Sequence, residues 1–383
     1  MELLPGKTLQ QLLKDFNQES NRVRALNYNV FLNADMFNGN SIMDALYYLQ
    51  KFVNWPTIKN INKAMTIDTN KNLVIEFYET LGLRDHVESI LKGDHPMFET
   101  RIDDTSSSYV GNKAYYPRLI FSVGEARRAQ GAINLAHESA HAISGYYAEM
   151  QELKKEETRI LETYGKDSRE FEEFKPLVTG FLDSQREYMV DCTSEIASRI
   201  MELLLLDFLI EKNTITQEDK QLYLDQRDAA FRSDLALMFQ EDIIYSKIIE
   251  IKKEKDCHIA ELNEEEYEEL MKRLSKNSHH KQLVKKFHFI SDRRKLDKTK
   301  WNSQYVFRYV ISEIVSRVWY DRYLSASAQE KIQMIDDLKT YIANSHQFTL
   351  KGVVELLLKE SFVKNIINEF ADLHMAENKE NRA

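Results

Sequence analysis

The chain has 383 residues, of which 43% are hydrophobic and 30% are charged, so it contains enough apolar side chains for a sizeable core. Its formal net charge of −9 gives no basis for binding nucleic acid. The sequence contains no apolar run of transmembrane length and no signal peptide, so we expect a cytoplasmic protein without a membrane partner. The two cysteines, Cys192 and Cys257, are too few for a disulfide framework, which agrees with a reducing compartment.

Apolar residues recur at helical spacing over most of the chain, which predicts a mainly α fold. The 11 glycines and 5 prolines do not gather into a linker, so the helices are expected to form one continuous body. Within it we distinguish an N-terminal helical lobe, residues 1–95, from the region 96–383. The predicted helices cover residues 9–26, 41–55, 72–83, 85–91, 125–150, 183–212, 216–253, 264–274, 304–324, 328–344 and 350–370, and a charged helical hairpin is predicted at 151–174.

The pattern changes between residues 97 and 123. Tyr109-Val110-Gly111-Asn112 is a turn signal, and residues 115–123 are rich in aromatic and β-branched side chains, which predicts a strand. We therefore expect a small β-sheet or hairpin directly before the next helix. This sheet would either border a cleft, where an extended peptide could pair with its edge, or simply cover the core.

The helix predicted at 125–150 carries a histidine, a glutamate, two further residues and a second histidine, which are His137, Glu138 and His141. Positions i and i+4 lie one turn apart on the same face of a helix, so both imidazole rings can point at one metal ion. Glu138 then lies beside them, as does the general base of zinc peptidases. The alternative is a helix with two solvated histidines. The flanking residues are apolar, however, and buried histidines need partners.

A third metal ligand is expected from the helix predicted at 183–212, where acidic residues follow one another at intervals of four, four and seven positions. These residues are Glu187, Asp191, Glu195 and Glu202. In one assignment Glu187 binds the metal, while Asp191 accepts a hydrogen bond from a metal-binding histidine and orients it. In the other, Glu195 binds the metal and Glu202 holds the histidine. The spacing alone does not distinguish the two assignments.

The segment Glu195-Ile-Ala-Ser-Arg-Ile-Met-Glu202 resembles the oligoendopeptidase F and thimet oligopeptidase family of zinc metallopeptidases. In that family a glutamate ligand is followed by a serine after three residues and by a supporting glutamate after seven, which match Ser198 and Glu202. The resemblance therefore favours Glu195 as the third ligand, and it extends over residues 100–370. It implies a zincin-type helical metallopeptidase whose small sheet borders the active-site cleft.

This resemblance also implies the chemistry. One Zn²⁺ per chain would be held by His137, His141 and Glu195, and Glu138 would take the proton from a zinc-bound water that attacks a peptide carbonyl. The substrate would be an oligopeptide or an accessible segment of a protein. The alternative is a non-catalytic binding protein on the same scaffold, which would need no general base.

The resemblance continues at Tyr305-Val-Phe-Arg-Tyr309, which is similar to a tyrosine-rich segment that faces the substrate in the family. Tyr305 and Tyr309 would therefore donate hydrogen bonds to the oxyanion, although aromatic packing on a helix explains either one alone equally well. Four features depart from the family. Alanine and serine stand at positions 140 and 144, where the family has glycine and histidine. Phe307 replaces a tyrosine, and the histidine that usually precedes this segment is absent, with His288 the nearest candidate to substitute for it.

Overall fold

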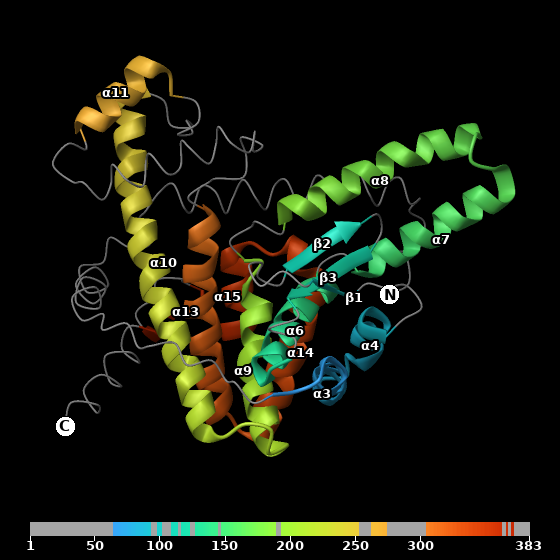
Figure 1. The fold of residues 1–383 in the computed structure, drawn as a ribbon, viewed down its shortest axis with the longest axis horizontal. Helices are drawn as coiled ribbons and strands as arrows, with labels where there is room; N and C mark the ends of the chain where they lie inside the picture. The colour runs from blue at the N-terminus through green and yellow to red at the C-terminus, as the bar shows by residue number, and fades with distance from the viewer. Residues whose placement is uncertain are drawn as a thin grey trace.

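A computed structural model describes residues 64–92, 98–101, 109–113, 116–122, 127–144, 147–188, 193–252, 262–273, 304–361, 365–366 and 369–370. Within these ranges the chain forms eleven α-helices and one three-stranded sheet, so the predicted mainly α class is confirmed (Figure 1). The helices predicted at 9–26 and 41–55 lie outside the described residues. None of the described helices combines the length and the hydropathy that a membrane-crossing segment requires.

Two helices from the predicted N-terminal lobe lie within the described residues, α3 (Ile67–Thr80) and α4 (Arg84–Lys92). They match the predicted helices at 72–83 and 85–91. Thr66 begins α3 because its hydroxyl accepts the backbone N–H of Thr69 at 3.0 Å. The buried side chains of both helices belong to the same hydrophobic core as those of the helices that follow. The boundary between the lobe and the rest of the chain remains a prediction.

A small sheet precedes the histidine helix, as predicted. It consists of β1 (Phe98–Arg101), β2 (Tyr109–Lys113) and β3 (Tyr116–Ser122) in the order β1-β3-β2, with β1 parallel and β2 antiparallel to β3. The predicted turn at residues 109–112 is wrong because these residues form β2, and the chain reverses after Lys113. The glycine and asparagine in β2 suggested a turn, but the ladder with β3 supplies the hydrogen bonds that hold them in a strand. Strands β2 and β3 contact the next helix.

The histidine helix, α6 (Ala129–Ile143), is shorter than predicted because Ser144 has an extended backbone with ψ 144°. Next come α7 (Tyr147–Tyr164) and α8 (Arg169–Tyr188), which contact each other and project from the body as a helical pair (Figure 1). The predicted helical hairpin is confirmed and is longer than expected.

The helix predicted at 183–212 is wrong in one respect, because the chain turns between α8 and α9 (Ile196–Glu211). Residues 193–195 form the turn, in which the N–H of Ile196 donates to the carbonyl of Thr193 at 3.1 Å. Tyr341, from a distant helix, donates its hydroxyl to the same carbonyl at 2.6 Å. Glu195 therefore belongs to this turn at the start of α9, whereas Glu187 lies on α8, so the predicted acidic stripe is not continuous along one helix.

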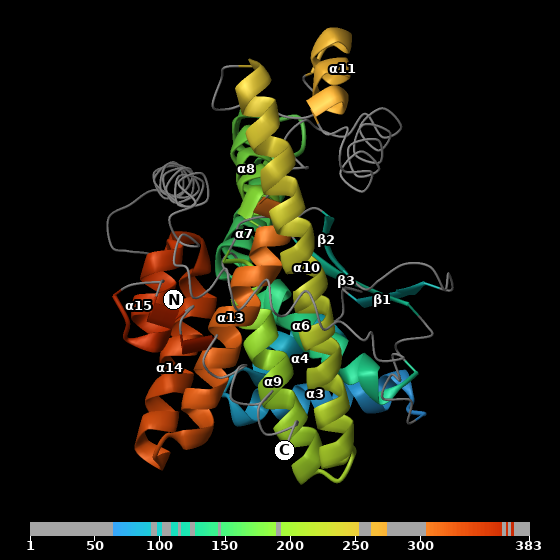
Figure 2. The same cartoon turned by 90° about the vertical axis from the view of Figure 1, so that its left-hand side faces the viewer.

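The remaining helices are close to their predicted ranges. They are α10 (Gln217–Lys252), α11 (Glu264–Arg273), α13 (Gln304–Ser325), α14 (Ala328–Asn344), the 3₁₀ helix η2 (Ser345–Gln347) and α15 (Leu350–Leu358). The helix predicted at 350–370 is interrupted after Leu358, where Lys359 has φ 52°, a left-handed conformation that ends a helix. At the centre of the body, α9 is buried along most of its length and contacts both α6 and α13 (Figure 2).

Candidate metal centre

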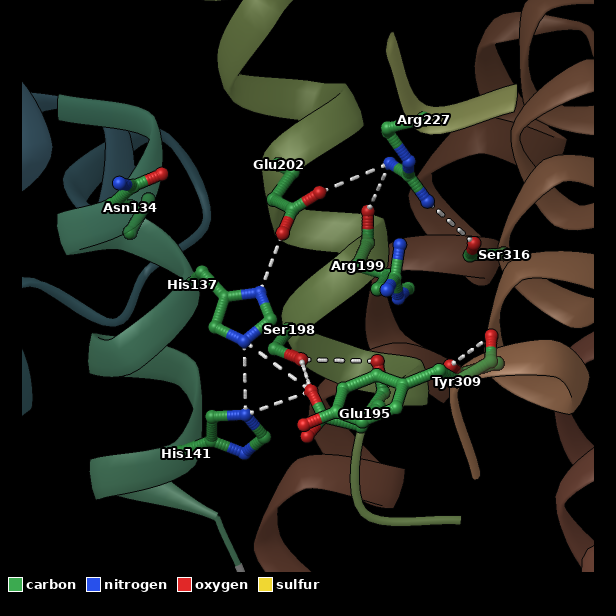
Figure 3. A network of polar contacts seen from close by, with 12 residues as sticks. Asn134, His137, His141, Glu195, Ser198, Arg199, Glu202, Arg227, Tyr309 and Ser316 are labelled. Atoms are coloured by element: carbon green, nitrogen blue, oxygen red, sulfur yellow. Dashed lines mark hydrogen bonds and ion pairs between the residues drawn. The ribbon is translucent and has the colours of Figure 1, made fainter. Parts of the chain in front are cut away.

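Three side chains from α6 and the start of α9 converge on one point (Figure 3). The Nε2 atoms of His137 and His141 are 3.1 Å apart, as expected for residues separated by one helical turn. The Oε2 atom of Glu195 lies 3.1 Å from Nε2 of His141 and 3.3 Å from Nε2 of His137. The turn before α9 ends at Glu195, and this position faces the side of α6 that carries the histidines. Within the described residues these groups are close enough to hold one metal ion.

The spacing of the three atoms fits a tetrahedral metal site. Histidine nitrogens and carboxylate oxygens bound to zinc at 2.0–2.2 Å in a tetrahedron lie about 3.3 Å from one another. The separations of 3.1, 3.1 and 3.3 Å observed between the three candidate atoms match this value. A carboxylate oxygen can only accept hydrogen bonds, and the same holds for an imidazole nitrogen that carries no hydrogen. The three atoms therefore repel one another unless a proton or a metal cation lies among them.

Most of this cluster is shielded from solvent, but the His137 side remains partly exposed. The side chains of Glu195 and His141 are 5% and 6% exposed, whereas that of His137 is 17% exposed. Burial alone would raise the pKa of Glu195, but His141, His137 and Arg308 outweigh it and hold the pKa well below its usual range. The carboxylate is therefore ionised and available as a ligand. Arg308 contributes through its Nη2, 3.6 Å from Oε1 of Glu195.

Glu202, two turns further along α9, contacts His137 on the ring nitrogen that faces away from the cluster. Its Oε1 lies 2.5 Å from Nδ1 of His137, and the hydroxyl of Tyr223 donates to Oε2 at 2.9 Å. Burial raises the pKa of Glu202, but Arg227 and His137 outweigh this effect and lower it to about 2. An ionised Glu202 accepts a hydrogen bond from the Nδ1–H of His137, and in the neutral ring this leaves the Nε2 lone pair directed at the cluster.

A second buried group, which we call the arginine layer, consists of Arg199 on α9, Arg227 on α10 and Glu313 on α13. Nη2 of Arg227 and Nη1 of Arg199 lie 2.6 Å and 2.8 Å from Oε2 of Glu313. The other end of the Arg227 guanidinium, Nη1, is 3.2 Å from Oε2 of Glu202. The arginine layer therefore connects to the metal cluster through Glu202, as Figure 3 shows for Arg227.

Sequence reasoning missed the members of the arginine layer, together with Tyr223 and Arg308. One signal was present, because Glu313 and Arg317 interrupt the apolar run 310–319 of α13. A charged residue at an inward position of a buried helix needs an opposite charge. The partners themselves come from other helices, so the sequence does not identify them.

The other predicted site residues have different positions. Glu138 lies on α6 beside the histidines, is partly exposed, and has a pKa that burial raises. Tyr309 lies on α13 with its hydroxyl 2.5 Å from Nη2 of Arg308, and the guanidinium groups of Arg308 and Arg199 lie 4.6 Å and 5.7 Å from the centre of its ring. Tyr305 lies on the same helix and Glu187 on α8, but the structure does not describe their side chains.

Two further predicted positions can be compared with the structure. The hydroxyl of Ser198 donates to Oε2 of Glu195 at 3.2 Å, so the serine of the family motif contacts the candidate ligand. Ser144 donates to the carbonyl of Ala140 at 2.5 Å, which leaves its side chain bonded within α6. Asp191 and His288 lie outside the described residues.

Comparison with protein-family models, curated protein sequences and solved structures finds no match for this chain. The resemblance to zinc oligopeptidases therefore stays a prediction that rests on the motifs themselves.

Proposed function

We propose that this chain is a zinc-dependent endopeptidase with a zincin-type fold, acting on oligopeptides or on an accessible segment of a protein. The observation that carries the proposal is the convergence of His137, His141 and Glu195, with Glu138 next to the first histidine on the same helix. A site that only stabilised the fold would need the ligands but not the adjacent carboxylate.

The donor set favours zinc over other ions. Two imidazole nitrogens and one carboxylate oxygen form the ligand set of many catalytic zinc sites, which keep a fourth position for water or substrate. Magnesium and calcium prefer six or more oxygen ligands, and the cluster offers too few. We therefore expect one Zn²⁺ per chain. The partial exposure of His137 supports a position that solvent can reach.

In the proposed reaction Glu138 moves the proton. Zinc in such a site supplies Lewis acidity, which lowers the pKa of a water molecule to about 7 and polarises a carbonyl. The Glu138 carboxylate accepts a proton from the attacking water and then delivers it to the nitrogen of the leaving amine. Burial raises the pKa of Glu138 above its usual value, so this carboxylate holds a proton more readily than an exposed glutamate does.

Tyr309 is the better supported of the two proposed oxyanion donors. A guanidinium group has no acceptor, so in the contact between Arg308 and Tyr309 the arginine donates and the phenol oxygen accepts. The phenolic hydrogen must then point in another direction. Because the same Arg308 nitrogen lies near Glu195, the hydroxyl is close to the metal cluster. Tyr305 shares this helix, one turn earlier, and is proposed for the same role.

The sheet supports a route for the substrate. Strands β2 and β3 contact α6, so the sheet lies beside the helix that carries the histidines (Figure 1). An extended peptide that adds to an edge strand would lie along this helix. We propose that the sheet borders the active-site cleft in this way.

Metal analysis and one substitution test the proposal. Wild-type protein is expected to hold one zinc per chain and to cleave a peptide library. Glu138→Gln should keep the zinc and lose roughly 100-fold or more in turnover, because it removes the proton carrier. Glu157→Gln, on the projecting pair α7–α8, is the control and should match wild type.

A metal-free wild-type protein, or full activity in Glu138→Gln, would contradict the proposal. The alternative function, a non-catalytic binding protein on this scaffold, is favoured by the absence of a histidine shortly before Tyr305 and by Phe307 in place of a tyrosine. It predicts that wild-type protein binds zinc and peptides but hydrolyses none of them.

A further inference from the structure

Glu313 is one of the most deeply buried charged groups among the described residues, with a side chain only 1% exposed. Burial raises the pKa of this carboxyl, but Arg227 and Arg199 outweigh it and keep the pKa below its usual value. Its Oε1 and Oε2 accept from Nε of Arg227 at 3.1 Å and 3.0 Å, and Oε2 also accepts from Nη2. Burying a carboxylate in the core between packed helices is unfavourable unless charged partners are held within hydrogen-bonding distance. The contacts with Arg227 meet this condition.

A continuous chain of charged contacts leads from Glu313 to the metal cluster. Glu313 holds one edge of the Arg227 guanidinium, and the other edge lies 3.2 Å from Oε2 of Glu202. Oε1 of Glu202 lies 2.5 Å from Nδ1 of His137. The chain therefore crosses four helices, from α13 through α10 and α9 to α6, and Figure 3 shows its last steps.

The planar guanidinium makes this chain directional. Its five N–H donors are fixed in one plane, so fixing the Nε and Nη2 edge on Glu313 also fixes where Nη1 points. The same edge is held by a further contact, because Nη2 also donates to the hydroxyl of Ser316 at 3.1 Å. Arg227 then reaches Glu202 from a single direction and, with Tyr223, occupies its Oε2. Only Oε1 is left to face His137.

We infer that Glu313 is a positioning residue for the metal site, acting through Arg227 and Glu202 on the orientation of His137. The inference rests on the proposed metal centre but not on peptidase activity. It assigns Glu313 an effect on zinc affinity, although the carboxylate is three contacts away from the metal cluster. A residue that only neutralised two buried arginines would affect folding and leave zinc affinity unchanged.

The test compares zinc affinities of folded variants by competition with a chromogenic chelator. Glu313→Gln alone leaves two buried arginines without their carboxylate and can unfold the protein. The double variant Glu313→Gln/Arg199→Met removes one negative and one positive charge, so its net charge equals that of wild type. The matched control is Arg199→Met, which keeps the contacts of Arg227 with Glu313 and Glu202.

The double variant should bind zinc about 10-fold more weakly than wild type, in the range seen when a group supporting a metal ligand is lost. Arg199→Met should stay within about 3-fold of wild type, because it leaves the contacts that support His137 in place. A double-mutant cycle that combines the Glu313 change with Glu202→Gln tests the route directly. Once Glu202 is replaced, the further loss of Glu313 should change zinc affinity little.

The outcomes separate the two proposals. Wild-type protein that binds no zinc overturns both the metal centre and the role of Glu313. If wild type binds zinc and the double variant binds it equally well, the metal centre stands and the positioning role is wrong. Additive losses from Glu313 and Glu202 also overturn the positioning role, because they show that Glu313 does not act through Glu202.

Discussion

The metal cluster and the arginine layer are two buried polar groups that share helix α9 but differ in how their atoms pair. In the arginine layer, the guanidinium donors of Arg199 and Arg227 meet the carboxylate acceptor of Glu313. In the metal cluster, two ring nitrogens and a carboxylate oxygen point at one another. The first group is complete within the protein, whereas the second needs a positive charge at its centre.

The pKa of His137 expresses the same difference. Burial alone would lower this pKa, but without a metal ion the carboxylates of Glu202 and Glu195 raise it to about 10. A metal ion that binds there must displace this proton. The arginine layer carries its positive charges permanently, because guanidinium groups do not lose their protons in proteins. The comparison agrees with the proposal that one group binds a metal and the other supports it.

The largest loss of zinc is expected from a substitution in the metal cluster itself. Glu195→Gln replaces the ionised oxygen with a neutral amide, so zinc content should fall from one per chain to near zero. Glu187→Gln is the matched control from the competing assignment and should keep its zinc. Elemental analysis after dialysis against a weak chelator measures both variants. Zinc loss in Glu187→Gln with retention in Glu195→Gln would reverse the assignment.

A smaller effect is expected where the two groups meet. Glu202→Gln removes the charge that holds His137 and Arg227, so zinc affinity should fall about 10- to 100-fold while one zinc still binds at saturation. Asp207→Asn is the control, because Asp207 lies on the same helix but bonds to Lys220 and Tyr320 instead. Equal affinities for the two variants would show that Glu202 does not support the metal site, and the arginine layer would then have no route to His137 through Glu202.

The histidine pair was predictable because its geometry is local. His137 and His141 are brought together by one turn of α6, and the spacing in the sequence fixes that relation. The third ligand was not decided by spacing, since the turn at 193–195 depends on Tyr341 from a helix far along the chain. The family resemblance selected Glu195 where periodicity left two choices, and the geometry brings Glu195 to the histidines.

The arginine layer was not predictable for the same physical reason. Arg199, Arg227 and Glu313 come together only where α9, α10 and α13 pack, and helical periodicity describes each helix alone. The sheet illustrates a related limit. Residues 109–112 resemble a turn locally, but pairing with β3 overrides that preference.

Removing one hydrogen bond to Glu202 should sharpen the comparison further. Tyr223→Phe deletes the hydroxyl that donates to Oε2, while Arg227 remains to hold the carboxylate. We expect zinc affinity to fall about 3- to 10-fold, since a hydrogen bond to a charged group contributes roughly 1.5–3 kcal/mol and part of it is replaced by Arg227. Chelator competition measures this change. Tyr320→Phe, which removes a hydroxyl bonded to Asp207, should leave zinc affinity unaltered, and an equal loss in both variants would contradict the expectation.

The last expected effect concerns the free energy of unfolding and not zinc affinity, and it involves Asp234 on α10, which lies near the arginine layer. Burial raises its pKa from 3.8 to about 6, more than Arg199 lowers it, and Glu313 adds to the rise. A carboxyl with a raised folded pKa binds more protons in the folded state, so stability falls as pH rises from about 4 to 6. Asp234→Asn removes this penalty and should stabilise the protein by about 1–3 kcal/mol at pH 8 and by less at pH 5.

Thermal melts of metal-free protein at the two pH values measure this difference. Asp225→Asn, at an exposed position of the same helix, is the control and should shift the melting temperature little at either pH. A gain for Asp234→Asn that is equal at pH 5 and pH 8 would show that the effect does not come from ionisation. A loss at pH 8 would show that the ionised Asp234 belongs to the arginine layer as a partner of Arg199, and the layer would then extend one residue further along α10.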